Sequence, residues 1–225
     1  MQGEIERALA VLLRRGRGDV SLTVAARTDA GVHAWGQVAS YEGEPVAPWG
    51  LNALLPDDVA ALSCTAADEW FDARRDATSR AYCYRVLARP ARGVMERGRA
   101  LHWPWRVDAG LLDACVAALA GAHDFTAFTP AQTEHVRFSR EVYAAWWRSG
   151  GAELLEFWIE ADAFMRHMNR VLVGTMLEVA GGRRALSDFL TLLEGRPRCD
   201  AGPTAPAHGL HLVGVGYGGR RVLAV

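Results

Sequence analysis

The order in which two hydrophobic periodicities alternate along this chain is the feature that most restricts its fold. Apolar residues at every second position predict strands, and apolar residues three or four apart predict helices. The strands are expected at residues 20–27, 37–41, 79–88, 142–148, 154–161 and 210–217, and the helices at residues 3–15, 48–55, 108–121, 164–180 and 187–194. Helices and strands mixed in this order predict an α+β protein with two sheet-bearing halves.

The division between the two halves is expected in the segment 89–107, which is rich in Arg, Gly and Pro. Asp108 follows it as the N-cap of the next helix. We therefore predict an N-terminal half at residues 1–90 and a C-terminal half at residues 91–225, the second of which contains the long helix 164–180.

Composition favours a folded protein without a membrane span. The chain has 225 residues, of which 50% are hydrophobic and 23% charged, and eight Trp. This mixture supplies a core and argues against intrinsic disorder. The longest apolar runs, such as residues 8–13, are too short to cross a bilayer, and the N-terminus lacks the basic start and apolar block of an export signal. We expect a soluble cytoplasmic protein.

The positive charge is unevenly distributed. All 25 basic residues are Arg, and nine of them lie between Arg74 and Arg106 against only Asp76 and Glu96. Such a segment can form a phosphate-facing stripe on a protein whose net charge is only −1. A solvated linker explains the same charges equally well, so both interpretations stay open.

Motifs for metals and nucleotide cofactors are absent from the sequence. The four Cys are scattered without a C-x-x-C pair, which predicts neither a disulfide framework nor a zinc site. There is no G-x-G-x-x-G and no G-x-x-x-x-G-K-[ST]. Of the seven His, only His33 lies beside other candidate chemistry. We expect an enzyme of this sequence to use side chains alone, with no metal and no cofactor.

The segment 27–33 combines an acidic and a basic residue around a tight turn at the end of a buried strand. Such a turn presents the Asp29 carboxylate rigidly, and Gly31 permits a positive φ or the close approach of another molecule. The other interpretation is an Asx-type turn, in which Asp29 only binds nearby N–H groups. Spacing alone does not decide between them.

The sequence of this segment is Arg27-Thr-Asp-Ala-Gly-Val-His33. It resembles the signature of the bacterial tRNA pseudouridine synthases that modify the anticodon arm, the TruA type. Five further motifs resemble the same family in the same order, over nearly the whole chain. They lie at residues 2–3, 71–84, 123–128, 164–174 and 202–210.

The resemblance implies a fold of two similar sheet-and-helix halves, with mixed, largely antiparallel sheets that form a central RNA cleft. It implies an isomerase of tRNA processing, which converts uridine to pseudouridine at positions 38, 39 and 40 of the anticodon stem-loop without a cofactor. It also implies a homodimer that binds one tRNA across both subunits. Trp146 and Trp147 suit such an interface, although core packing explains them equally well.

The resemblance also implies roles for individual residues. Asp29 matches the nucleophile, Arg170 the basic residue placed against it, and Tyr82 the residue that stacks on the target base. A nearby guanidinium favours the ionised carboxylate, and a π-face retains a base without fixing its rotation. The residues implied to bind substrate are Tyr82, Arg27, His33, Arg80 and Arg166.

Each of these roles has a simpler alternative. Arg170 is also typical of an exposed position on a surface helix, although Arg166, four residues earlier, would share its helix face and the two could form a basic edge toward the cleft. Tyr82 and Tyr84 also suit a buried strand, with Tyr84 expected in the core. His33 and Asp124 suit support of a loop as well as contact with RNA.

The sequence departs from the family pattern in two places. Family members begin with a strand before the segment that matches Gln2-Gly3, and this chain starts without it. The alternative function is therefore a catalytically silent RNA-binding or RNA-folding protein of the same fold. Ala26 also stands where the family commonly has Gly, a change that extended backbone accommodates.

Overall fold

The computed structural model describes residues 1–16, 18–133, 136–151 and 153–223. The chain forms two compact units, each built from two separate stretches of sequence. Unit 1 comprises Met1–Arg27 and Val38–Asp76, and unit 2 comprises Thr28–Gln37 and Ala77–Val225. The Asp29 turn therefore belongs to the same unit as the C-terminal part of the chain.

Unit 1 is a small helical core beside a two-stranded sheet. The amphipathic helix expected at residues 3–15 is α1 (Gln2–Leu12), and the short helix expected at residues 48–55 is α2 (Pro48–Asn52). β1 (Thr23–Val24) pairs antiparallel with β3 (Ala39–Ser40). The core that joins these elements consists of buried apolar side chains, namely Ala8, Leu9, Ala10, Val20, Leu22 and Leu51.

Unit 2 contains a seven-stranded sheet in the order β2-β9-β4-β8-β7-β6, with β5 paired to β4 outside this path. The strands are β2 (His33–Ala34), β4 (Ala77–Leu87), β5 (Leu101–His102), β6 (Gly121–Asp124), β7 (Ser139–Ser149), β8 (Leu154–Ala161) and β9 (Leu210–Tyr217). The pairs β2–β9 and β4–β5 are parallel, and the other pairs are antiparallel. The α+β class and the mixed, largely antiparallel sheet are thus confirmed.

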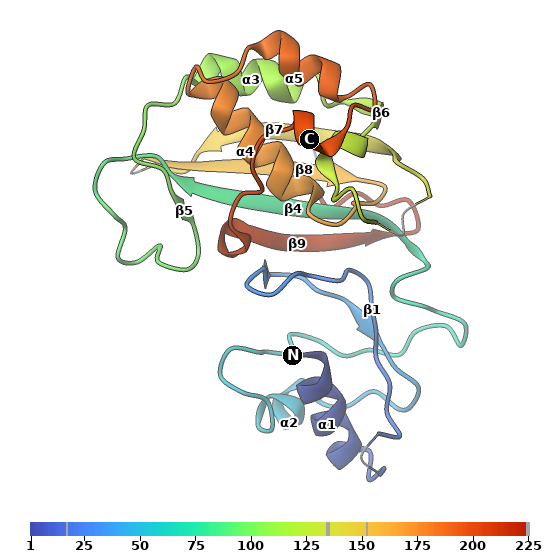
Figure 1. Cartoon of the computed structure of the whole chain (residues 1–225). Coiled ribbons are helices and arrows are strands. Elements are labelled where there is room, and N and C mark those ends of the chain that lie inside the picture. Colours follow the sequence, from blue (N-terminus) through green and yellow to red (C-terminus); the bar gives the residue numbers. More distant parts are fainter. Residues whose placement is uncertain (17, 134–135, 152, 224–225) are drawn as a thin grey trace. The chain divides into compact units, whose positions relative to one another are not determined.

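Helices cover one face of this sheet. Figure 1 shows α3 (Ala109–Ala117), α4 (Met168–Ala180) and α5 (Leu186–Leu192) on the same side of β4, β8 and β9. Along β4, Tyr82 and Tyr84 alternate with Cys83 and Arg85, as period two requires. Tyr84 is fully buried, which confirms its expected place in the core.

The helix starts agree with the sequence at α3 but not at α4. Asp108 is the N-cap of α3, and its side chain accepts a hydrogen bond from the Leu111 N–H, as expected. The helix expected at residues 164–180 begins only at Met168, because His167 has φ +64 and ψ −3, a left-handed conformation that no α-helix continues through. The expectation that Arg166 shares a helix face with Arg170 is therefore wrong.

The strand expected at residues 20–27 is also shorter than predicted. Only Thr23–Val24 forms a ladder, because its described partner β3 is itself two residues long. The compact units likewise differ from the halves 1–90 and 91–225. β2 pairs with β9 and β4 lies at the sheet centre, so residues 28–37 and 77–90 belong to unit 2. A functional division at residue 90 stays a prediction, as does the RNA cleft between the halves.

Two smaller expectations concern the cysteines and membranes. All four cysteines are free thiols, as the scattered spacing predicts. Among the described residues, no helix is both long enough and apolar enough to cross a bilayer.

Candidate active site

A tight turn presents Asp29 just before the start of β2. The Val32 N–H donates to the Asp29 carbonyl oxygen at 3.1 Å, and Gly31 has φ +85. β2 follows directly, and its parallel pairing with β9 aligns His33 with His211. The turn is thereby fastened to the sheet, while one third of the Asp29 side chain remains exposed. The carboxylate is thus held in place and still open to another molecule.

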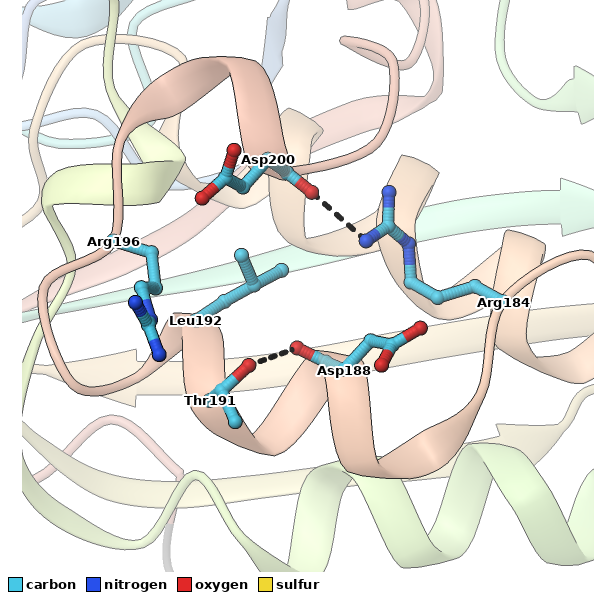
Figure 2. A pocket seen from close by; sticks show the side chains of 6 residues that line it. All are labelled: Arg184, Asp188, Thr191, Leu192, Arg196 and Asp200. Carbon is cyan, nitrogen blue, oxygen red and sulfur yellow. Dashed lines mark hydrogen bonds between the residues drawn. The ribbon is translucent and has the colours of Figure 1, made fainter.

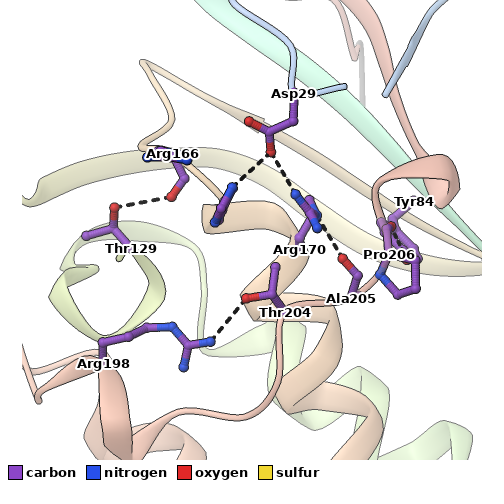
Figure 3. A network of polar contacts seen from close by, with 10 residues as sticks. Asp29, Tyr84, Thr129, Arg166, Arg170, Arg198, Thr204, Ala205 and Pro206 are labelled. Carbon is purple, nitrogen blue, oxygen red and sulfur yellow. Dashed lines mark hydrogen bonds and ion pairs between the residues drawn. The ribbon is translucent and has the colours of Figure 1, made fainter. Parts of the chain in front are cut away.

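Arg170, in the first turn of α4, binds this carboxylate. Its Nη1 lies 2.8 Å from Asp29 Oδ2, and its Nε donates to the Ala205 carbonyl oxygen at 2.7 Å (Figure 3). The Ala205 N–H donates back to the Arg170 carbonyl oxygen at 3.0 Å. The guanidinium, only 15% exposed, is therefore fixed at two points, and its bond to the carboxylate is a charge-assisted hydrogen bond.

The segment that contains Ala205 is itself packed tightly against α4 and β4. A Cβ at Gly174 would overlap the Pro203 carbonyl oxygen, so only glycine lets α4 approach this closely. Tyr84 donates its hydroxyl hydrogen to the Pro206 carbonyl oxygen at 2.8 Å. These contacts explain why the motifs at residues 164–174 and 202–210 occur together, since both position Arg170.

His167 also contacts Asp29, and the sequence analysis missed it. Its Nε2 lies 3.3 Å from the same Oδ2 that Arg170 binds. Burial lowers the pKa of His167, the neighbouring Asp29 opposes this shift, and Arg170, Arg166 and Arg198 reinforce it. The sequence feature that could have indicated this contact is the spacing of His167, which lies three residues, or about one helical turn, before Arg170. The contact itself depends on the left-handed backbone at His167.

Tyr82 lies on β4 and is only 7% exposed. Its ring meets Phe164 edge-on, with ring centroids 5.0 Å apart and an interplanar angle of 84°. Burial raises the pKa of Tyr82 to about 12, the charge of Arg80 opposes this shift, and that of Asp29 adds to it. The phenol therefore stays protonated at neutral pH. Its stacking on a target base stays a prediction.

The other predicted residues have partners within the protein. Arg80 donates from Nη1 to the carbonyl oxygens of Ala77 at 3.0 Å and Asp162 at 3.2 Å. The Arg166 carbonyl oxygen accepts from Thr129 Oγ1 at 3.2 Å (Figure 3). These contacts hold the Arg80 side chain and the Arg166 backbone, and contact of either residue with RNA stays a prediction.

His33 and Asp124 show contacts that support loops. His33 Nε2 lies 2.8 Å from the Gly98 carbonyl oxygen, and its ring stacks on His211 with centroids 4.8 Å apart. Asp124 Oδ1 accepts from both the backbone N–H and the hydroxyl of Thr126. A role of either side chain toward RNA stays a prediction.

The two units share the predicted RNA-binding arginines between them. Arg27 is exposed and belongs to unit 1, whereas Asp29 belongs to unit 2. Of the nine arginines between residues 74 and 106, Arg74 and Arg75 belong to unit 1 and the other seven to unit 2. A single phosphate-facing stripe stays a prediction.

Three guanidinium groups, those of Arg166, Arg170 and Arg198, lie close enough to His167 to act on its charge. Arg166 and Arg198 act on His167 together with Arg170, and Arg198 Nη2 donates to Thr204 Oγ1 at 3.2 Å (Figure 3). Such a group of positive charges beside an exposed carboxylate attracts an anionic ligand. Within the described ranges, no group of three His, Cys, Asp or Glu side chains is placed to hold a metal ion.

A separate pocket beside α5 contains none of the predicted site residues. It is lined by Arg184, Asp188, Thr191, Leu192, Arg196 and Asp200 (Figure 2). The guanidinium of Arg184 already donates to the Asp200 carbonyl oxygen at 2.8 Å and to Glu178 at 3.1 Å. Two acidic and two basic side chains balance each other here, so the pocket attracts no particular charge.

The chain is similar to known proteins over most of its length. A family model described as tRNA pseudouridine synthase matches residues 115–218. A protein of Bacillus pumilus (strain SAFR-032) named tRNA pseudouridine synthase A is 38% identical over 223 residues, which cover 96% of this chain and 89% of that protein. The protein of the same name from Myxococcus xanthus is 40% identical over 207 residues, which cover 88% and 77%.

These similarities agree with the architecture and the site. An α+β fold in which an arginine holds a partly exposed carboxylate is the arrangement that the motifs predict for a pseudouridine synthase. The chain belongs to the tRNA pseudouridine synthase family.

Proposed function

We propose that this protein converts uridine to pseudouridine at positions 38, 39 and 40 of the tRNA anticodon stem-loop, with Asp29 as the nucleophile. The observation that carries the proposal is the 2.8 Å contact between Arg170 Nη1 and an Asp29 side chain that remains one-third exposed. The relatives named tRNA pseudouridine synthase A support tRNA as the substrate.

The reaction is an isomerisation whose atoms and electrons balance within the substrate. The bond between uracil N1 and ribose C1′ breaks, and a bond between uracil C5 and C1′ forms. The proton on C5 is lost, and N1 gains one. Nothing is oxidised or reduced, so a nucleophile and a means of retaining the detached base are the essential parts.

Asp29 suits the role of nucleophile because it is both ionisable and accessible. The guanidinium of Arg170 stabilises its negative charge, and the turn at Gly31 keeps the carboxylate at the surface of unit 2. Attack of the carboxylate at C1′ and attack at C6 of the base agree equally with this geometry.

Other residues must bring the target base within reach of Asp29 and retain it after its glycosidic bond has broken. The target nucleotide must leave its stack before Asp29 can reach it, at a cost of a few kcal/mol. We assign Tyr82 to stack on the freed base, and Arg27, His33, Arg80 and Arg166 to bind the RNA. The guanidinium groups of Arg166 and Arg198 beside the site favour phosphate contacts, so binding should weaken steeply with salt.

The test of this proposal is Asp29→Asn, assayed with tRNA that carries tritium at C5 of uridine. Because isomerisation removes the C5 proton, tritium release reports turnover directly. The variant keeps the size of the side chain but loses its charge. We expect tRNA binding, measured by filter retention, to stay within about threefold, and tritium release to fall by at least about 10⁴-fold, because the nucleophile is lost.

The matched control is Asp113→Asn, which makes the same change at an exposed position of α3. It should turn over like the unchanged protein. Full turnover by Asp29→Asn refutes the nucleophile. An unchanged protein that binds tRNA without releasing tritium is instead the silent RNA-binding alternative.

Substrates in which only U38, U39 or U40 is present test the target positions. The homodimer and the cytoplasmic location rest on the family resemblance and on composition. The mass of the protein in solution, from light scattering, tests the homodimer.

A further inference from the structure

His167 and Arg170 bind the same oxygen of the Asp29 carboxylate. Arg170 Nη1 lies 2.8 Å from Oδ2, and His167 Nε2 lies 3.3 Å from it. Among the residues that the structure describes, Oδ1 of Asp29 accepts no hydrogen bond. The two carboxylate oxygens are therefore distinguished: one is bound twice, and the other is available.

The surroundings of His167 determine which of its nitrogens carries a proton. A carboxylate oxygen only accepts, so Nε2 must carry the hydrogen for this contact to be a hydrogen bond. The charged groups that face the ring are Asp29, Arg170, Arg166 and Arg198, and burial is the main reason why the His167 pKa is lowered. The lowered pKa favours the neutral ring at neutral pH, and the contact with Oδ2 favours the tautomer that carries its hydrogen on Nε2.

The backbone at His167 places the ring toward Asp29 rather than along α4. The residue has φ +64, a conformation that glycine adopts readily and other residues adopt rarely. It is the N-cap residue of α4, yet its side chain makes no capping hydrogen bond to the helix. The side chain is instead used for the contact with Asp29.

We propose that His167 is a positioning residue, which holds Oδ2 of Asp29 together with Arg170 and so presents Oδ1 to the reacting nucleotide. The inference rests on the proposed function, since it concerns the same nucleophile. When Oδ1 forms its bond to C1′ as the N1–C1′ bond breaks, or to C6 as the electron pair of the C5–C6 double bond moves onto the uracil, Oδ2 becomes the carbonyl oxygen of an ester and keeps both contacts. No proton has to move between His167 and Asp29 in this step.

The test is His167→Gly, because glycine takes φ +64 without strain. The His167 side chain is 23% exposed, so free imidazole can reach the space that its removal leaves. We expect kcat for tritium release to fall by about 10- to 100-fold, because one polar contact to the carboxylate is lost, with KM for tRNA unchanged. Added imidazole should restore at least about a third of kcat. A merely structural role for His167 predicts no such rescue.

The matched control is Glu153→Gly, which replaces another non-glycine residue of positive φ, at +63, in the turn between β7 and β8. Its kcat should be unchanged and insensitive to imidazole. Unchanged kcat in His167→Gly, or a lowered kcat that imidazole does not raise, overturns the positioning role. Failure of the proposed function is a different result, in which the unchanged protein and Asp29→Asn release tritium equally.

Discussion

Replacing Arg170 by Lys separates the charge of this residue from its geometry. The guanidinium makes two hydrogen bonds in different directions, from Nη1 to Asp29 Oδ2 at 2.8 Å and from Nε to the Ala205 carbonyl oxygen at 2.7 Å. Lys keeps the positive charge but has a single Nζ on a flexible stem, which cannot reproduce this fixed fork. Arg170→Lys therefore loses at least one of the two contacts.

The size of the effect follows from that loss. A hydrogen bond to a charged group contributes about 1.5–3 kcal/mol, which corresponds to about 10- to 150-fold in rate if it is needed to hold the nucleophile. We expect kcat of Arg170→Lys to fall within this range. KM for tRNA should change little, because Arg170 is directed at Asp29 and Ala205 rather than at solvent.

The assay is tritium release in a single turnover, with enzyme in excess over tRNA, so that slow product release cannot mask the chemical step. Arg196→Lys is the matched control, because Arg196 is exposed and lines the separate pocket beside α5 (Figure 2). A rate within twofold of the unchanged protein for Arg170→Lys would refute the reasoning, since charge alone would then suffice.

Two further predictions concern stability. Gly174→Ala forces a methyl group against the Pro203 carbonyl oxygen, and overpacking of this kind costs about 1–3 kcal/mol in the free energy of unfolding, measurable by urea denaturation; an unchanged midpoint contradicts the close approach. Burial, assisted by the neighbouring His33, lowers the pKa of His211 to about 4. Below about pH 6.5 the unfolded chain therefore binds more protons than the folded protein. The free energy of unfolding should decrease by up to about 3 kcal/mol as the pH falls from 6.5 to 4. His211→Asn should flatten that decrease, and an equal decrease in this variant would exclude His211 as its cause.

The strands that the sequence predicted well are those whose partners run along their whole length. The ranges expected at 154–161 and 210–217 are those of β8 and β9, because both strands pair with β4 along their length. Residues 20–27 alternate similarly, yet only Thr23–Val24 forms a ladder. Alternation specifies the faces of a strand, whereas the ladder depends on a partner that periodicity does not show.

The candidate site was predictable only where the motifs of the family identify its residues. The resemblance identified Asp29 and Arg170, which the structure places 2.8 Å apart although 141 positions separate them. The contact of His167 with Asp29 was not predicted, because the apolar spacing extends the expected helix back to residue 164. Hydrophobic periodicity does not indicate a residue with a left-handed backbone. Its contact with Asp29 arises from the backbone conformation of a single residue.

The place of β9 in the sheet has a consequence for biosynthesis. β9 is the last described strand of the chain, yet it lies between β2 and β4 in the interior of the sheet. β2, which directly follows the Asp29 turn, has β9 as its only ladder partner among the described strands. On the ribosome, the Asp29 turn therefore lacks this ladder partner until residues 210–217 have been synthesised and have left the exit tunnel.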